Sequence, residues 1–301
     1  MLWLIIAILS YFLFAVVSLG DKYLLAGPPN PKSYSFYVGI LGVLVLVLIP
    51  FVDFIIPDFY EILLCFLAGA IFIFALLGFY EGLQRFEASR IIPAIGGFSP
   101  LFIFILVFFF SGGEVILGFK EILAFLLLIL GSVFIAWSPS AKASLKSLKI
   151  SALTAFLFAL FFVLTKYVYI LLPFWTGFIW IRIGAFLVAL FFIFFKDIRK
   201  EIFSGGLTFN KKTGVFFLFN QGIGGGASIL QNWAVALAGL VYLSVINALQ
   251  GVQYVFLFIL TLLFSLKFPN FFKEEISKKV IFQKLSAIFF IGIGLIILAL
   301  K

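Results

Sequence analysis

Arg182 is the residue whose chemistry stands out first, because it lies inside a long apolar stretch of the chain. Residues 150–195 hold only two charged side chains, those of Lys166 and Arg182. A charge at the centre of a membrane-spanning helix costs roughly 2.5–3.5 kcal/mol on insertion scales, so such a group faces protein or water. A guanidinium there can bind an anionic or carbonyl-bearing ligand, on which Trp180 could stack, or it can serve a structural ion pair or carbonyl contact.

A second group of polar side chains lies within residues 213–266, a stretch that carries no charge. Asn247, Gln250 and Gln253 recur at intervals of three and share a helical face with Tyr254. Amides in lipid need hydrogen-bond partners, so they either line a polar cavity or join helices, at about 0.6 kcal/mol per bond. The same stretch holds further polar and aromatic candidates, namely Asn220, Gln221, Gln231, Asn232 and Trp233.

Three charged residues near the ends of apolar stretches are candidates for proton coupling or ion pairing. Glu81 follows Tyr80, a further candidate ligand contact, and could exchange a proton with water near the membrane. Arg85 lies four residues later and offers Glu81 a simple salt bridge instead. Lys22 and Lys166 could pair with an anionic group or extend their ammonium groups to the membrane interface.

Glycine and proline gather at two places in the apolar stretches. Proline removes a backbone donor and glycine lowers helix propensity, so both loosen a helix. Bends at membrane depth are tolerated mainly where the backbone lines a cavity or packs on protein. These residues therefore form either hinges or close-packing surfaces. The hinge candidates are Pro93, Gly96, Gly97, Pro100, Gly224 and Gly225.

The composition requires these residues to sit on membrane-spanning helices. The chain is 65% hydrophobic and 11% charged over 301 residues, whereas soluble domains are roughly 45–50% apolar and 25% charged. Uncharged stretches of about 20 residues can cross the hydrocarbon layer as helices, and none shows the alternation of barrel strands. We expect an all-α integral membrane protein of ten transmembrane helices. Six expected spans are single apolar stretches, at residues 2–20, 33–52, 62–80, 91–113, 122–141 and 280–300. Residues 150–195 should form two spans divided at Pro173, and residues 213–266 two more that turn back near Ala238 and Gly239.

The same composition argues against several classes of protein. A single cysteine, Cys65, excludes an intrachain disulfide, and the absence of histidine removes the commonest metal ligand and general base. We therefore expect no enzyme, metal or cofactor. The net charge of +9 comes from basic residues in short connections rather than on one soluble face, so we expect no nucleic-acid partner.

The chain repeats itself weakly. Residues 13–15, followed by Lys22, recur as residues 157–159, followed by Lys166, and residues 101–106 resemble residues 255–260. These echoes fall in the first and fourth helices of each half. Because each half has five helices, the second must enter the membrane in the opposite sense, which gives two inverted repeats. The expected division is residues 1–141, a basic connecting loop at 142–149, and residues 150–301.

The positions of lysine and arginine predict the orientation. Seventeen of the 21 basic residues lie in the odd-numbered connections. Basic connections stay in the cytoplasm, so both termini are expected outside.

The order of several short motifs resembles the drug/metabolite transporter superfamily, and within it the ten-helix proteins with two EamA domains. The first half carries residues 80–83 (YEGL), residues 99–102 (SPLF), Gly113-Glu114 and Gly131. The second carries residues 231–237 (QNWAVAL) and residues 292–294 (GIG), but has Gln253-Tyr254 where the first half has a proline. Family members are usually drawn with cytoplasmic termini, which differs from the charge count.

This resemblance implies a central cavity between the halves that opens alternately to each side. We expect a secondary transporter for a small polar metabolite, amino acid or drug-like molecule, driven by a proton, an ion or the substrate gradient. The alternative is a flippase for a lipid or lipid-linked precursor. The expected setting is a prokaryotic inner or plasma membrane, with lipids as partners and a monomer or homodimer as the assembly.

Overall fold

The structure is a computed structural model, and it is all-α in the residues that it describes. These are residues 2–24, 31–86, 88–114, 117–137, 145–196, 199, 211–267 and 278–299. Within them the chain forms ten helical rods, three of which combine α-helical with 3₁₀ segments. The expected number of helices is therefore found in the described part of the chain.

The described helices follow one another along the chain. In chain order they are α1 (Leu2–Leu24), α2 (Pro31–Gly42) continued by η1 (Val43–Phe51), α3 (Phe59–Arg85), α4 (Ala88–Phe110), α5 (Phe119–Ala136), α6 (Leu145–Leu171), α7 (Phe174–Phe191) continued by η2 (Phe192–Phe194), α9 (Lys211–Leu237), η3 (Leu240–Tyr242) with α10 (Leu243–Ala248) and α11 (Gln250–Lys267), and α12 (Lys278–Ala299).

Local chemistry explains several helix ends. The expected breaks are confirmed: Pro173 separates α6 from α7, and α9 ends at Leu237, just before Gly239. Asp58 and Glu61 form a capping box at the start of α3, which satisfies backbone donors that the first turn leaves free. Helix α6 begins at Leu145, inside the connection expected at residues 142–149.

Five described segments are apolar and long enough to cross a membrane. They are Leu2–Gly20, Phe59–Gly82, Leu145–Leu171, Phe174–Phe194 and Leu240–Thr261, and shorter apolar helices cover Ser35–Phe51, Ala94–Phe110 and Phe282–Leu298. The lengths and composition of these helices indicate a multi-pass integral membrane protein.

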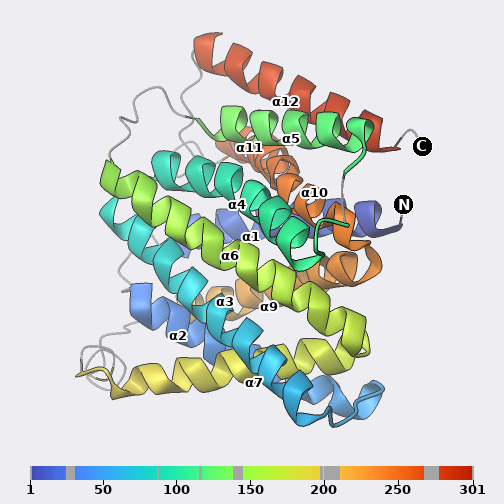
Figure 1. The fold of residues 1–301 in the computed structure, drawn as a ribbon. Coiled ribbons are helices and arrows are strands. Elements are labelled where there is room, and N and C mark those ends of the chain that lie inside the picture. Colours follow the sequence, from blue (N-terminus) through green and yellow to red (C-terminus); the bar gives the residue numbers. More distant parts are fainter. Residues whose placement is uncertain are drawn as a thin grey trace.

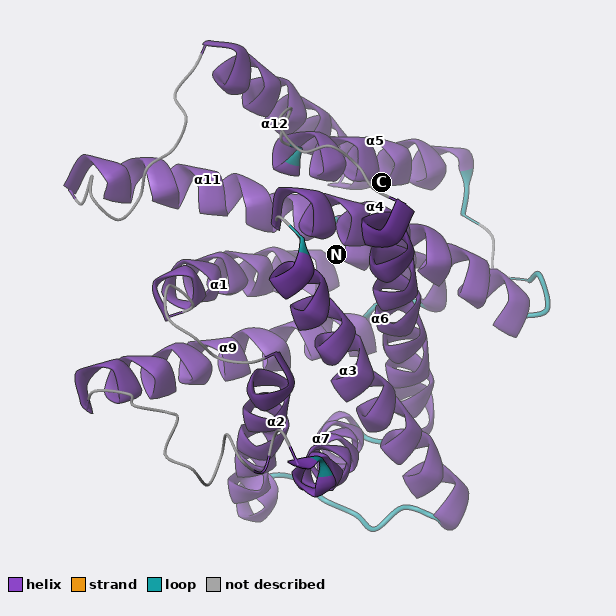
Figure 2. Ribbon diagram, turned by 90° about the vertical axis from the view of Figure 1, so that its left-hand side faces the viewer, coloured by secondary structure: helices purple, strands orange, loops and turns teal. Residues whose placement is uncertain are grey.

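The helices pack side by side in groups, some pairs antiparallel and others parallel (Figures 1 and 2). Helix α5 pairs with α12, α1 lies between α9 and α11, and α6 lies between α3 and α4. Helix α7 packs on α2 and along α3. The start of α1 and the end of α12 lie at the same end of the bundle (Figure 1). We call the opposite end, where α1 and α3 end and α9 begins, the basic end, after the lysine-rich connections that the sequence puts there.

Small residues permit the closest helix approaches. A Cβ on Gly131 of α5 would lie 3.0 Å from the Ala287 carbonyl oxygen of α12, and one on Gly69 of α3 would overlap the Ile181 carbonyl oxygen of α7. In membranes, where apolar burial drives helix association weakly, such backbone contact supplies much of the packing energy.

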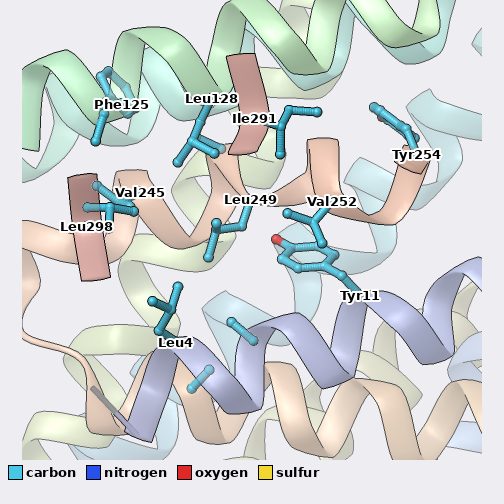
Figure 3. Close-up of a cluster of buried hydrophobic side chains, with 14 of the residues drawn as sticks. Leu4, Tyr11, Phe125, Leu128, Val245, Leu249, Val252, Tyr254, Ile291 and Leu298 are labelled. Atoms are coloured by element: carbon cyan, nitrogen blue, oxygen red, sulfur yellow. The ribbon is translucent and has the colours of Figure 1, made fainter. Parts of the chain in front are cut away.

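The largest apolar cluster joins α1, α5, α10, α11 and α12 (Figure 3). Tyr11 of α1 extends into it toward Leu249 and Val252. Its hydroxyl donates to the Ile246 carbonyl at 2.8 Å, so the cluster tolerates one satisfied polar group.

Candidate functional site

Arg182 lies near the middle of α7 at a junction of several helices. Its guanidinium carbon is 5.1 Å from the centroids of the Phe72 ring of α3 and the Phe178 ring of α7. Its Cδ lies 3.6 Å from where a Cβ on Gly42 of α2 would be. The guanidinium donates to the Ser228 hydroxyl of α9. One side chain therefore connects first-half and second-half helices at membrane depth.

A chain of hydrogen bonds continues from Arg182 across α9 to α6. Asn232, one turn after Ser228, donates its side-chain amide to the Ser228 carbonyl at 2.9 Å. The Tyr169 hydroxyl of α6 donates to the Asn232 side-chain oxygen at 2.8 Å. The chain fixes the face of α9 that carries Ser228 against α6 and α7. We call Arg182, Ser228, Asn232 and Tyr169 the Arg182 network.

The charge of Arg182 is not neutralised by protein in the described part of the chain. The ion pair found there joins Arg85 and Glu81 at 3.4 Å, at the basic end of α3. Cation–π attraction from Phe72 and Phe178 and one hydroxyl offset part of the desolvation of the guanidinium. The arrangement is suited to receiving a ligand with complementary charge or carbonyl oxygens.

Aromatic rings pack between the Arg182 network and the end of the bundle away from the basic end. Trp233 stacks on Phe174 at 5.2 Å between centroids and meets Trp175 edge-on at 6.1 Å, while it remains 40% exposed. Trp180, a candidate to stack on a ligand, packs on Phe54 and Phe66, and its indole nitrogen is buried without a hydrogen-bond partner in the described residues.

In the described residues, α9 and α7 share little packing. Gly225 is one turn before Ser228 on the same helical face, and it is exposed, with no atom of the described residues within 4 Å of the position that a Cβ would take there. Leu218, two turns further toward the basic end, is 58% exposed. Among the described residues, nothing therefore covers the Gly225 and Leu218 positions of the face that binds α6 and α7 at Ser228 and Asn232.

The amide face expected on the second-half helices is divided between α10 and α11. A Cβ on Gly96 of α4 would lie 3.3 Å from the Tyr254 hydroxyl and 3.7 Å from the Gln250 side-chain oxygen, so these groups meet α4. Tyr254 and Asn247 are 8% and 6% exposed, and the Tyr254 hydroxyl and the Asn247 side-chain oxygen lack partners in the described residues. Unpaired buried polar atoms are rare and indicate water or ligand.

Other amides join helices. The Gln253 amide donates to the Ser18 hydroxyl of α1 at 3.1 Å. Gln231 forms a side-chain hydrogen bond with Tyr11, and the Asn220 amide donates to the Val17 carbonyl at 3.3 Å. These three amides therefore join neighbouring helices, the second of the two roles expected for amides in this stretch.

The remaining charged candidates lie apart from Arg182. Lys166 is 6% exposed, and its ammonium donates to the Val235 and Ala236 carbonyls at 3.1 and 2.9 Å, so it caps the end of α9 instead of extending to an interface. Glu81 pairs with Arg85, and Tyr80 lies edge-on to Phe79. The side chain of Lys22 lies outside the described residues.

The hinge candidates lie within continuous helices. Helix α4 continues through Pro93 and Pro100, and α9 continues through its glycines. Gly96 and Gly97 sit close to neighbouring side chains, and Gly224 packs on Val17 of α1, which favours packing roles. The side chain of Pro93 lies outside the described residues.

Sequence reasoning did not select Ser228, Tyr169, Phe72 or Phe178. Ser228 precedes Asn232 by four residues, so the helical face marked by Asn232 could have indicated it. Nothing in the sequence distinguishes Phe72 and Phe178 among 45 phenylalanines.

Comparison with known proteins supports the fold alone. One crystal structure of a protein is similar over 98% of this chain and 97% of that chain, with a TM-score of 0.67 and 15% sequence identity. No family model matches the sequence. No curated protein matches it either. The fold and site thus define a multi-pass helical membrane protein with a polar network at the junction of its helix groups.

Proposed function

We propose that the protein is a secondary transporter that moves a small polar metabolite, amino acid or drug-like molecule across the membrane by alternating access. The observation that carries the proposal is the Arg182 network, a charged and hydrogen-bonded group at membrane depth where first-half and second-half helices meet. Polar groups inside a membrane are costly and mark substrate pathways by default.

The helix pairings support two inverted repeats. Counted in order, the first helix packs on the eighth and ninth, α9 and α11, and the sixth packs on the third and fourth, α3 and α4. Adding or subtracting five from each helix number turns the first set of pairings into the second, as a repeat of five helices requires. The same shift leaves two pairings unchanged, that of the fifth helix with the tenth (α5 with α12) and that of the second with the seventh (α2 with α7). This pattern, with the motif order, favours a divergent member of the EamA-type drug/metabolite transporters.

One departure from this symmetry favours alternating access. Helix α3 packs closely along α7 through Gly69 and Gly184. In the described residues, the equivalent pairing of α9 with α2 has no packing of similar extent. Transporters of inverted repeats expose a midplane site to one side when their two halves adopt unlike conformations. We take the basic end as the open one, because no described residue covers the face of α9 at Gly225.

The test is solute flux in proteoliposomes. Purified protein should give saturable uptake or counterflow of at least one member of a panel of labelled amino acids, organic acids and sugar phosphates. Arg182→Ala and Gln250→Ala should reduce that flux, while Arg85→Gln, at an exposed ion pair outside the site, should retain it. Lipid scrambling without flux of any soluble solute would favour a flippase and contradict the proposal.

A further inference from the structure

The guanidinium of Arg182 has unused binding capacity. It carries five N–H donors in a planar fork that matches a carboxylate or phosphate. In the described part of the chain, one hydrogen bond is formed, to the Ser228 hydroxyl. The Phe72 and Phe178 rings each lie 5.1 Å from the guanidinium carbon and supply no hydrogen-bond acceptor, so the remaining N–H donors are left for a ligand.

The positive charge is also unusual for its depth. The described carboxylates of Asp53, Asp58, Glu61, Glu81, Glu114 and Glu121 all lie in connections or terminal turns of helices. A buried charge is normally paired, since desolvation costs several kcal/mol per ion. The described site therefore has a net positive charge that protein does not balance.

The surrounding groups hold this charge in place. Ser228 is fixed by Asn232, and Asn232 is fixed by Tyr169 of α6. On the same face of α9, one turn toward the basic end, no described atom lies within 4 Å of a Cβ placed on Gly225. The guanidinium is thus preorganised, and we take the Gly225 side as its approach.

From this arrangement we infer that the substrate is an organic anion whose carboxylate or phosphate group binds the donor edge of Arg182 beside Ser228. The inference rests on the transport function proposed above and specifies its substrate class. A neutral substrate would leave the guanidinium unbalanced in the loaded state, whereas an anion supplies the missing partner.

The experiment compares uptake of matched solutes that differ in charge. Proteoliposomes receive labelled lactate against lactamide, succinate against succinamide, and glucose 6-phosphate against glucose. We expect the transported solutes to be anions, with the neutral member of each pair taken up at least about tenfold more slowly. The pairs also separate carboxylate from phosphate recognition.

Variants then assign the preference to Arg182. Arg182→Gln should reduce uptake of the anion about 10- to 100-fold, because charge-assisted hydrogen bonds are lost. Arg182→Lys keeps the charge without the fork and should raise KM while preserving the preference for anions. Arg85→Gln is the matched control and should leave uptake unchanged. Melting temperatures confirm that each variant is folded.

The outcomes separate the two proposals. Flux of neutral solutes at the rate of their anionic partners, or unchanged anion uptake by folded Arg182→Gln, would overturn the anion inference and leave transport standing. Absence of flux for all six solutes, with or without lipid scrambling, would count against transport and therefore against both.

Discussion

Lys166 is the residue whose buried charge has a defined structural partner. Its ammonium donates to the Val235 and Ala236 carbonyls, where the α9 dipole is negative. We predict that Lys166→Met lowers the free energy of unfolding by about 1.5–3 kcal/mol, the usual contribution of a hydrogen bond to a charged group. Denaturation in detergent measures the change. Lys146→Met, on an exposed position of the same helix, is the control and should change stability by about 0.5 kcal/mol or less. Equal stability of both variants would show that the cap contributes nothing.

Tyr169 allows a milder test of the Arg182 network. Tyr169→Phe keeps the ring and removes the hydroxyl that holds Asn232, so Ser228 loses its indirect support. We predict a rise in KM of about two- to tenfold, equivalent to one neutral hydrogen bond. Tyr60→Phe changes an exposed tyrosine and should leave KM unaltered. If both variants transport alike, the network does not support the site.

Among single residues, the sequence identified candidate site residues whose types are rare in apolar stretches. It did not identify site residues whose types are common there. Arg182 and Asn232 stand out because charges and amides are costly in lipid. Ser228, Phe72 and Phe178 acquire significance only from helix packing, which depends on contacts between distant segments. The position of Trp180 also depends on packing. Residues two apart point to different sides of a helix, so Trp180 lies away from Arg182 and stacks on Phe54.

The pairing of α5 with α12 can be tested by two glycines on these helices. A Cβ on Gly131 would lie 2.6 Å from Ile291 Cγ1 and 3.0 Å from the Ala287 carbonyl oxygen, whereas one on Gly292 meets nothing within 4 Å. We predict that Gly131→Ala destabilises by about 1–3 kcal/mol through overpacking. Gly292→Ala should be neutral or stabilising, because alanine favours helix. Melting temperatures compare them, and the reverse order would contradict the packing of α5 on α12.

The number of helices could be predicted from the lengths of the apolar stretches, and the breaks inside the longest stretches from Pro173 and Gly239. Both signals act on the local backbone, so no tertiary contact is needed to read them. The predicted start of the sixth helix, at residue 150, lies several residues after the observed start of α6 at Leu145. Hydropathy detects only the apolar part of a helix, and α6 begins before it. Lys146 and Lys149 are exposed on helical turns that the apolar stretch does not include. The grouping of helices depends on close contacts, as at Gly69 and Gly184, that no local pattern reveals.

For the whole molecule, the distribution of lysine and arginine predicts an orientation. A reporter enzyme that is active only outside the cytoplasm should be active when fused at Lys301 and inactive when fused within residues 196–212. The reason is that basic connections remain in the cytoplasm. The shared end of α1 and α12 agrees with both termini lying on one side of the membrane (Figure 1). A cytoplasmic reporter at Lys301 would reverse the assignment and make the open, basic end the outer one.

The central claim, alternating access, is tested most directly by thiol accessibility at Gly225. In a Cys65→Ala background, Gly225→Cys places a thiol on the uncovered face beside Ser228, and Ala227→Cys places one on the buried face toward α1 as the control. Membrane-impermeant maleimide is applied to oriented vesicles from each side. Alternating access predicts that Gly225→Cys reacts from the basic side, that a transported solute changes this rate, and that Ala227→Cys stays unreactive. Equal and simultaneous labelling of Gly225→Cys from both sides, or from neither, would contradict it.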